Sequence, residues 1–182
     1  MQTVPIIATN RLILRSATNS DLDQLYDIVF SDPEVMSQAF EGKPLSRKQA
    51  ADFFASSFDR DGNGMQLGVL TLKGSGAVIG FAGLLESAAI GKQDFEIGFV
   101  LGRAFWRRGY ATEIGRAQIE YGLLQKKCPR LLAFVSPKNE ASKSALLKIG
   151  MQHHSIIETS SRGMRDVYIV YPTFEPIGKT RP

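Results

Sequence analysis

The sequence predicts a mixed α/β fold, in which helices cover both faces of a central, mixed but mostly antiparallel sheet of about seven strands. Three observations lead to this prediction. Strand-like and helix-like segments alternate in the order β-α-α-β-β-β-α-β-α-β-β. A Gly-Ser-Gly segment at 74–76 separates two strands as a hairpin turn would. Two later strands are joined by a long helix, which predicts a parallel crossover inside the antiparallel sheet.

The first half of the chain supplies strands on either side of two helices. Residues 11–15 alternate polar and apolar side chains, as a half-buried strand does. A capping cluster at 19–21 precedes apolar residues at helical spacing over 22–29, and Asp32-Pro33 is expected to end that helix. Ser46 is expected to cap a second helix. Two strands follow this helix, at 65–72 and 77–85.

The second half contains the predicted crossover and a closing hairpin. A strand at 95–101 leads into a helix over about 108–126, and the continuous apolar run 131–135 predicts a strand buried on both faces. A further helix spans 139–149 and stops at Gly150. The last predicted strand pair comprises residues 151–158 and 165–171, with a turn at 162–163.

Bulk properties indicate one globular domain over all 182 residues, with 173–182 as a loose tail. No run reaches the ~18 apolar residues of a membrane helix, so no membrane partner is expected. The single Cys128 excludes an internal disulfide and favours a cytoplasmic location. No cluster has metal-ligand spacing, so no metal is expected. The net charge of +4 suits either a phosphorylated ligand or a solvated basic surface, and no nucleic-acid-binding motif accompanies it.

One basic, glycine-containing segment stands at the predicted junction of a strand and a helix. It comprises residues 105–113 and includes Arg107, Arg108 and Gly109. A helix N-terminus presents unpaired N–H groups that suit phosphate oxygens, and glycine lets a ligand approach the backbone closely. The segment therefore predicts a pyrophosphate site, while an ordinary capped helix with a solvated basic turn remains the alternative. The usual dinucleotide and P-loop fingerprints are absent.

Segments spread over nearly the whole chain resemble the GCN5-related N-acetyltransferase (GNAT) superfamily, and within it the RimJ/RimL-like branch. The similar segments are 9–15, 31–35, 96–99, 106–113, 139–142 and 146–151. The family's phosphate-binding signature is Gln/Arg-x-x-Gly-x-Gly/Ala, which here reads Trp106-x-x-Gly109-x-Ala111. The resemblance implies a single-domain GNAT-like fold whose sheet splays apart at its parallel strand pair. The tryptophan departs from the signature, and its indole has packing as an alternative role.

The resemblance also implies a site for acetyl-CoA as cosubstrate. The implied pyrophosphate contacts come from Arg107, Arg108, Gly109, Tyr110, Ala111 and Thr112. The implied pantetheine and acetyl contacts come from Phe99, Val100, Leu101, Asn139 and Ser142. Asn139 has a second interpretation as a helix N-cap, and Ser142 as a partner of the helix backbone.

The implied reaction is transfer of the acetyl group to a primary amine, either a protein N-terminus or a small amine, by direct attack on the thioester. Glu96 is the candidate base, acting through water, and an ordinary strand-edge carboxylate is the alternative. Many relatives carry a tyrosine acid about seven residues after the asparagine. Here Leu146 occupies that position, which leaves the role vacant or passes it to Ser142 or water. The absent tyrosine motivates the alternative of a non-catalytic acyl-CoA-binding module or sensor.

The resemblance places the acceptor pocket in residues 31–47 and 156–168. Four side chains there are candidates to line it: Phe40, Glu41, Arg162 and Tyr168. This mixed set does not choose between acceptors. A monomer and a homodimer are both compatible with the sequence.

Overall fold

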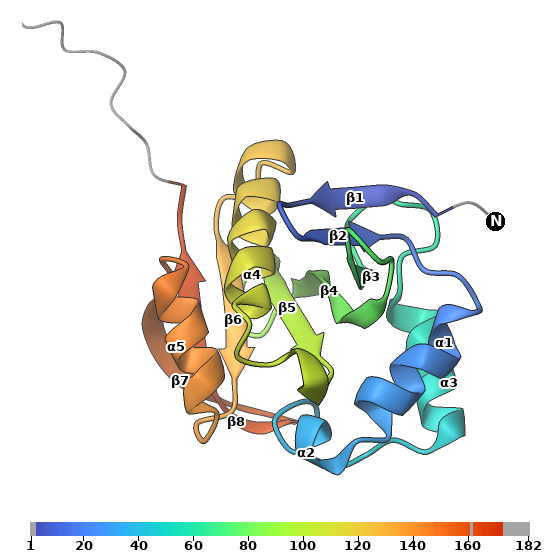
Figure 1. The fold of residues 1–182 in the computed structure, drawn as a ribbon. Coiled ribbons are helices and arrows are strands. Elements are labelled where there is room, and N and C mark those ends of the chain that lie inside the picture. The colour runs from blue at the N-terminus through green and yellow to red at the C-terminus, as the bar shows by residue number, and fades with distance from the viewer. Residues whose placement is uncertain (1–2, 161, 173–182) are drawn as a thin grey trace, which may run out of the picture.

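The computed structural model describes residues 3–160 and 162–172; the tail expected at 173–182 lies outside the described residues. Eight strands form one sheet (Figure 1). They are β1 (Pro5–Ala8), β2 (Leu12–Arg15), β3 (Leu67–Leu72), β4 (Val78–Ser87), β5 (Asp94–Leu101), β6 (Leu131–Val135), β7 (Gln152–Thr159) and β8 (Gly163–Val170). Their order across the sheet is β1-β2-β3-β4-β5-β6-β8-β7. Among these eight strands of the described chain, only β5 and β6 pair in parallel, which confirms the predicted mixed, mostly antiparallel sheet.

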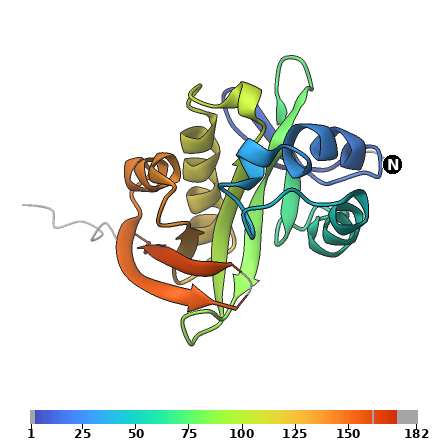
Figure 2. The same ribbon diagram turned by 90° about the horizontal axis from the view of Figure 1, so that it is seen from below.

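The helices cover both faces of this sheet. They are α1 (Asp21–Leu25), α2 (Pro33–Met36), α3 (Arg47–Ser57), α4 (Tyr110–Glu120) and α5 (Glu140–Lys148). A π-helical turn prolongs α1 over Tyr26–Phe30, and another prolongs α4 over Tyr121–Gln125. Figure 2 shows α4 and α5 on one face and α1 and α3 on the other.

Each face has its own apolar core, because successive strand side chains point to opposite sides. On the α4–α5 face, Ile114, Leu146 and Ile149 pack against the sheet. On the opposite face, helix side chains that include Phe30 and Phe54 form the second core. The central strands β3, β4 and β6 are largely buried on both sides, as predicted for 131–135.

Local capping explains where two helices begin. Ser46 Oγ accepts a hydrogen bond from the Gln49 amide while the Gln49 side chain accepts one from the Ser46 amide, so α3 starts with a capping box. Asn139 Oδ1 accepts from the Ser142 amide at 3.0 Å and caps the start of α5 by this single bond. These two predicted caps are confirmed, whereas Ser20, the N-cap of α1 within the predicted cluster at 19–21, makes no side-chain capping hydrogen bond.

Two elements differ from the sequence prediction. The strand β1 was not expected; it is only four residues long and begins at a proline. Asp32-Pro33, expected only to end a helix, also starts α2, because Asp32 Oδ1 accepts from the Glu34 amide at 2.8 Å. Proline fits there because the first helical position needs no N–H donor.

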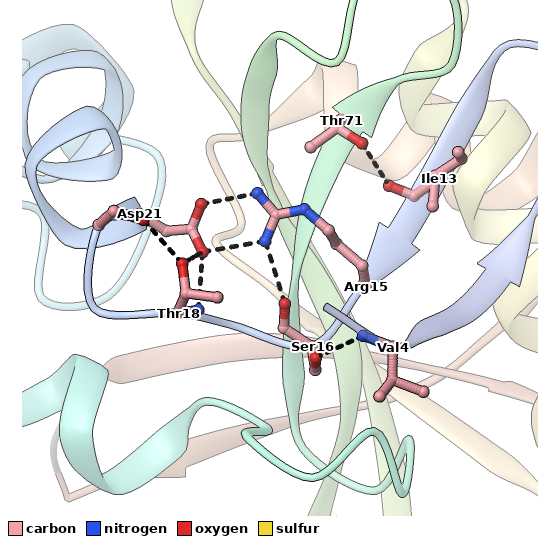
Figure 3. Close-up of polar contacts among 8 residues, drawn as sticks. Val4, Ile13, Arg15, Ser16, Thr18, Asp21 and Thr71 are labelled. Atoms are coloured by element: carbon pink, nitrogen blue, oxygen red, sulfur yellow. Dashed lines mark hydrogen bonds and ion pairs between the residues drawn. The ribbon is translucent and has the colours of Figure 1, made fainter. Parts of the chain in front are cut away.

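A buried ion pair fixes the turn between β2 and α1 (Figure 3). The Asp21 carboxylate accepts hydrogen bonds from Arg15 at 2.6 and 2.9 Å and from the amide and hydroxyl of Thr18 at 2.7 and 2.8 Å. Burial raises the pKa of Asp21, but the hydrogen bonds from Arg15 and Thr18 outweigh it and bring the pKa below the ordinary 3.8. The carboxylate therefore stays charged and holds the first helix against the sheet.

Candidate active site

The sheet opens between its two parallel strands. β5 and β6 pair only at Phe95–Leu131 and Glu96–Leu132. Beyond these pairs β5 keeps its other neighbour β4, and β6 keeps β8, but the two strands no longer bond to each other. The splay that the sequence resemblance implied is therefore present, and it leaves one backbone edge of β5 without a strand partner from Ile97 onward.

A buried ion pair lies at the closed end of this opening. Arg130, just before β6, donates to both carboxylate oxygens of Asp94, the first residue of β5, at 2.8 and 2.7 Å. The Asp94 side chain is only 2% exposed. Such a two-pronged pair is geometrically specific, so it fixes where the two strands meet.

A cleft of about 720 Å³ passes through the opening. Phe53 and Phe81 line it from the α1–α3 side, whereas Ser142 and Leu146 line it from α5 on the other side. The cleft brings together five of the sequence-predicted site residues: Glu96, Phe99, Val100, Asn139 and Ser142. Leu101, the last residue of β5, and residues 107–112, which lead into the first turn of α4, lie outside its lining.

The glycine-arginine segment has the backbone geometry of an anion-binding turn. Gly109 is the N-cap of α4 with φ of +80°, a conformation that favours glycine. Arg107 has a positive φ of 59° as well. The first intrahelical bond runs from the Glu113 amide to the Gly109 carbonyl, so the amides of residues 109–112 are those that helix geometry leaves without an intrahelical acceptor. Arg107 and Arg108 are exposed beside them.

Contacts of two side chains, Trp106 and Arg11, anchor this segment. The Trp106 indole N–H donates to the Leu101 carbonyl at 2.7 Å, so the tryptophan ties the segment to the end of β5. Arg11 donates to the Arg108 carbonyl at 3.0 Å, and its guanidinium lies 4.6 Å from the centre of the Tyr110 ring. In the structure the Trp106 indole therefore packs and bonds within the protein, in agreement with the alternative role given for it above.

A carboxylate in the first turn of α4 completes this anchor. Glu113 accepts from Arg11 Nε at 2.6 Å, from the Arg11 amide at 2.8 Å and from the Thr9 hydroxyl at 2.6 Å. Burial raises the pKa of Glu113, but these hydrogen bonds outweigh it and lower the pKa overall. The Glu113 carboxylate lies next to the exposed amides, but Arg11 neutralises its negative charge. It therefore does not repel an incoming anion.

Glu96 is held in the cleft by an arginine from the β7–β8 turn. Both carboxylate oxygens accept from the Arg162 guanidinium at 3.3 Å, and the Glu96 side chain is 12% exposed. The same guanidinium lies over the Phe134 ring. Arg162 therefore fixes the orientation of the Glu96 carboxylate. A substrate group could bind Glu96 only at a carboxylate lone pair that Arg162 does not use.

The asparagine and serine of α5 face the cleft from its other side. Asn139 uses Oδ1 as the helix cap, so the capping interpretation holds and only its amide N–H₂ is available to another partner. Ser142 is half-buried one turn later. Leu146 is 2% exposed and contributes an apolar wall.

Three of the four side chains expected to line the acceptor pocket lie together in the structure. Phe40, Glu41 and Arg162 line the cleft, but Tyr168 does not. Tyr168 points to the α5 face, where its ring meets His153 edge-on. Strand alternation explains the error, because in β8 Arg165 faces the cleft and residues an odd number of positions away face the opposite side.

Residues 11–152 match the family described as the acetyltransferase (GNAT) domain, which is more than half of the chain. The chain belongs to the GNAT acetyltransferase family. Its relatives include the N-acetyltransferase YoaA of Bacillus subtilis (strain 168), which is 30% identical over 158 residues covering 84% of this chain and 86% of YoaA.

Solved structures agree with this GNAT assignment at the level of the fold. A GNAT-family acetyltransferase from Bacillus anthracis has a TM-score of 0.76 at 21% identity, with 91% of this chain and 97% of that chain covered. Spermidine N-acetyltransferase from Vibrio cholerae, solved with CoA and spermine, has a TM-score of 0.71 at 15% identity and 90% and 96% coverage.

Neither a cluster of three metal-ligating side chains nor a membrane-length apolar helix occurs in the described part of this GNAT domain. Within 3–160 and 162–172, no three His, Cys, Asp or Glu side chains are grouped to hold a metal ion. No helix in that part of the chain is long and apolar enough to cross a membrane.

Sequence reasoning missed two arginines of this GNAT domain. Arg165 lines the cleft and donates to the Phe40 carbonyl at 2.7 Å. The only sequence signal was an arginine on the same side of a strand as the buried Val167. Arg11 was noticed as part of a strand, but its contact with the α4 segment spans almost a hundred residues and has no local signature.

Proposed function

We propose that this GNAT domain transfers an acetyl group from acetyl-CoA to a primary amine by direct attack, and that it belongs to the RimJ/RimL-like branch. The observation that carries the proposal is the cleft through the sheet, which lies on β5 upstream of the exposed amides at the start of α4. In this proposal the strand β5 connects the site for the thioester to the site for the pyrophosphate.

The coenzyme contacts follow from the groups that lack protein partners. The amides of Gly109, Ala111 and Thr112, with Arg107 and Arg108 nearby, would hold the pyrophosphate. The unpartnered edge of β5 at residues 99–101 would pair with the amides of the pantetheine arm as an added strand does. The side-chain N–H₂ of Asn139 would donate to the same arm.

In the proposed reaction, the acceptor ammonium gives one proton to Glu96 through water. The neutral amine then attacks the thioester carbon, forming the C–N bond, while a backbone N–H of Phe99 or Val100 stabilises the oxyanion. The C–S bond breaks, and the leaving thiolate receives the second amine proton through Ser142 or water. The products are an N-acetyl amide and the coenzyme thiol.

A non-catalytic acyl-CoA-binding module is the second candidate. It is favoured by Leu146, whose buried side chain stands where many relatives have a tyrosine acid. Both candidates predict coenzyme binding, but only the enzyme releases thiol when an amine is added.

Calorimetric titration with coenzyme A, followed by thiol release from acetyl-CoA with a broad amine panel, tests both candidates. The panel should include polyamines and short peptides, because similar folds include a spermidine N-acetyltransferase and an L7/L12 α-N-protein acetyltransferase. Saturable binding with amine-dependent release supports the enzyme. Binding without release favours the module, and the absence of binding contradicts both.

A further inference from the structure

The acceptor side of the cleft contains more positive charge than the proposed amine chemistry requires. Arg162 and Arg165 both line this wall, and both are half-buried. A site for a cationic amine would be expected to place carboxylates here and to exclude guanidinium groups, because like charges repel in a partly desolvated cleft. The two arginines therefore need a separate explanation.

Arg162 has an acidic partner, but Arg165 has none within the described chain. Arg162 is paired with Glu96. Arg165 donates only to main-chain carbonyls, those of Met164 at 2.8 Å and Phe40 at 2.7 Å. Burial, and then the charge of Arg162, lower the pKa of Arg165. Its guanidinium is thus partly desolvated beside another cation, an arrangement that an incoming anion would relieve.

The remaining charged groups on the cleft do not neutralise Arg165. The acidic lining residues besides Glu96 are Glu41 and Glu86, and neither makes an ion pair with Arg165. Glu86 instead accepts from the Gln93 side chain at 3.3 Å. Lys43 adds a further positive charge at the rim.

We propose that the acceptor carries a carboxylate as well as the reactive amine, and that Arg165 and Arg162 bind this carboxylate. This inference rests on the proposed acetyltransferase function and names its substrate class. Arginine suits the role because its planar fork matches the two oxygens of a carboxylate. Phe40, Phe53 and Phe81 line the same cleft and provide an apolar surface for a side chain. Amino acids with apolar side chains are the simplest members of this class.

The Glu96–Arg162 ion pair contains a partner for each charged group of such a substrate. A zwitterionic acceptor brings an ammonium group for Glu96 and a carboxylate for Arg162. Its binding therefore exchanges the Glu96–Arg162 pair for two substrate pairs, and it gives Arg165 an anionic partner. An amine without a carboxylate would separate Glu96 from Arg162 and leave two guanidiniums without a counter-charge.

Matched amines test this proposal on the purified full chain. The pairs are phenylalanine with 2-phenylethylamine and leucine with 3-methylbutylamine, which differ only by the carboxylate; spermidine and phosphoethanolamine are added. Thiol release from acetyl-CoA is measured for each. We expect kcat/KM to be at least about tenfold higher for the carboxylate-bearing member of each pair, because a site built for a polar group discriminates strongly against its absence.

Arg165→Gln and Arg165→Lys identify the residue responsible. Arg165→Gln should raise KM for phenylalanine about 30-fold while changing kcat little, because one partner of a buried charge pair is removed. Arg165→Lys should recover part of that loss, and neither should alter KM for 2-phenylethylamine comparably. Arg60→Gln is the control, since Arg60 is exposed and lies outside the cleft. A merely structural role through Phe40 would impair both amines equally.

Several outcomes overturn the inference while leaving the proposed function intact. These are equal rates within the matched pairs, a preference for spermidine, and a preference for the phosphate of phosphoethanolamine. If coenzyme A binds but no amine turns over, calorimetry with N-acetylphenylalanine decides: binding that depends on Arg165 supports the carboxylate site, and no binding overturns it. Failure to bind coenzyme A would instead contradict the proposed function itself.

Discussion

Replacing Gly109 by valine tests whether the start of α4 is the coenzyme site. Gly109 has φ of +80°, and a Cβ there would lie 3.3 Å from Arg11 Nη2, the movable end of a side chain. The main effect is therefore backbone strain, which for an L-residue in this region costs about 2 kcal/mol. If the loop relaxes to avoid the strain, the amides lose their alignment, and the same energy appears as a roughly 30-fold weaker Kd for coenzyme A.

Gly91→Val is the matched control for this experiment. Gly91 has φ of +79°, its Cβ would meet nothing within 4 Å, and it lies in the loop between β4 and β5. Valine meets the same backbone strain at both positions, so any change in Tm should be similar in the two variants, but only Gly109→Val should weaken coenzyme A binding in calorimetry. An unchanged Kd in Gly109→Val would refute the assignment of the pyrophosphate to this turn.

Three further variants or measurements address chemistry, stability and reactivity. Glu96→Gln should lower kcat about a hundredfold with little change in the Kd for acetyl-CoA, and full activity across the pH range would remove Glu96 from the mechanism. Asp21→Asn should reduce the free energy of unfolding in urea by about 3 kcal/mol, because Arg15 loses its buried partner, whereas the exposed Asp23→Asn should cost almost nothing; equal losses would contradict the assignment. Because the pKa of Asp21 in the fold lies below 3.8, its contribution is complete above that pH and is lost as the pH falls through the lower folded value. Burial raises the pKa of Cys128, so Ellman's reagent should label it at least about tenfold more slowly in the native protein than in urea; equal rates would mean that the thiol is accessible.

Local signals in the sequence were enough to predict most elements. Ser46 and Asn139 mark helix starts because their caps involve residues only three positions away. At Asp32-Pro33 the local signal was read incompletely, because the residues that end one helix also start the next. Pro5–Ala8 escaped prediction because so short a strand is defined mainly by its pairing with β2.

The site depends on contacts that sequence spacing does not encode. The opening between β5 and β6 was implied by family resemblance, since no periodicity in either strand shows where pairing stops. Tyr168 was assigned to the wrong face because the choice between β8's two faces depends on which helix covers each one. Arg165 gained significance only when its partners were known to be carbonyls and not a carboxylate.

The short pairing between β5 and β6, which we call the seam, joins the two parts of the sheet as a hinge would. The panels β1–β5 and β6–β8–β7 meet at two residue pairs beside Asp94 and Arg130. A group that pushes β5 and β6 apart at the open end therefore strains the two closing pairs, one of which contains Glu96. We therefore expect that the ability of the protein to accept acyl groups longer than acetyl depends on how firmly β5 and β6 are held together at these two pairs, as well as on the width of the cleft.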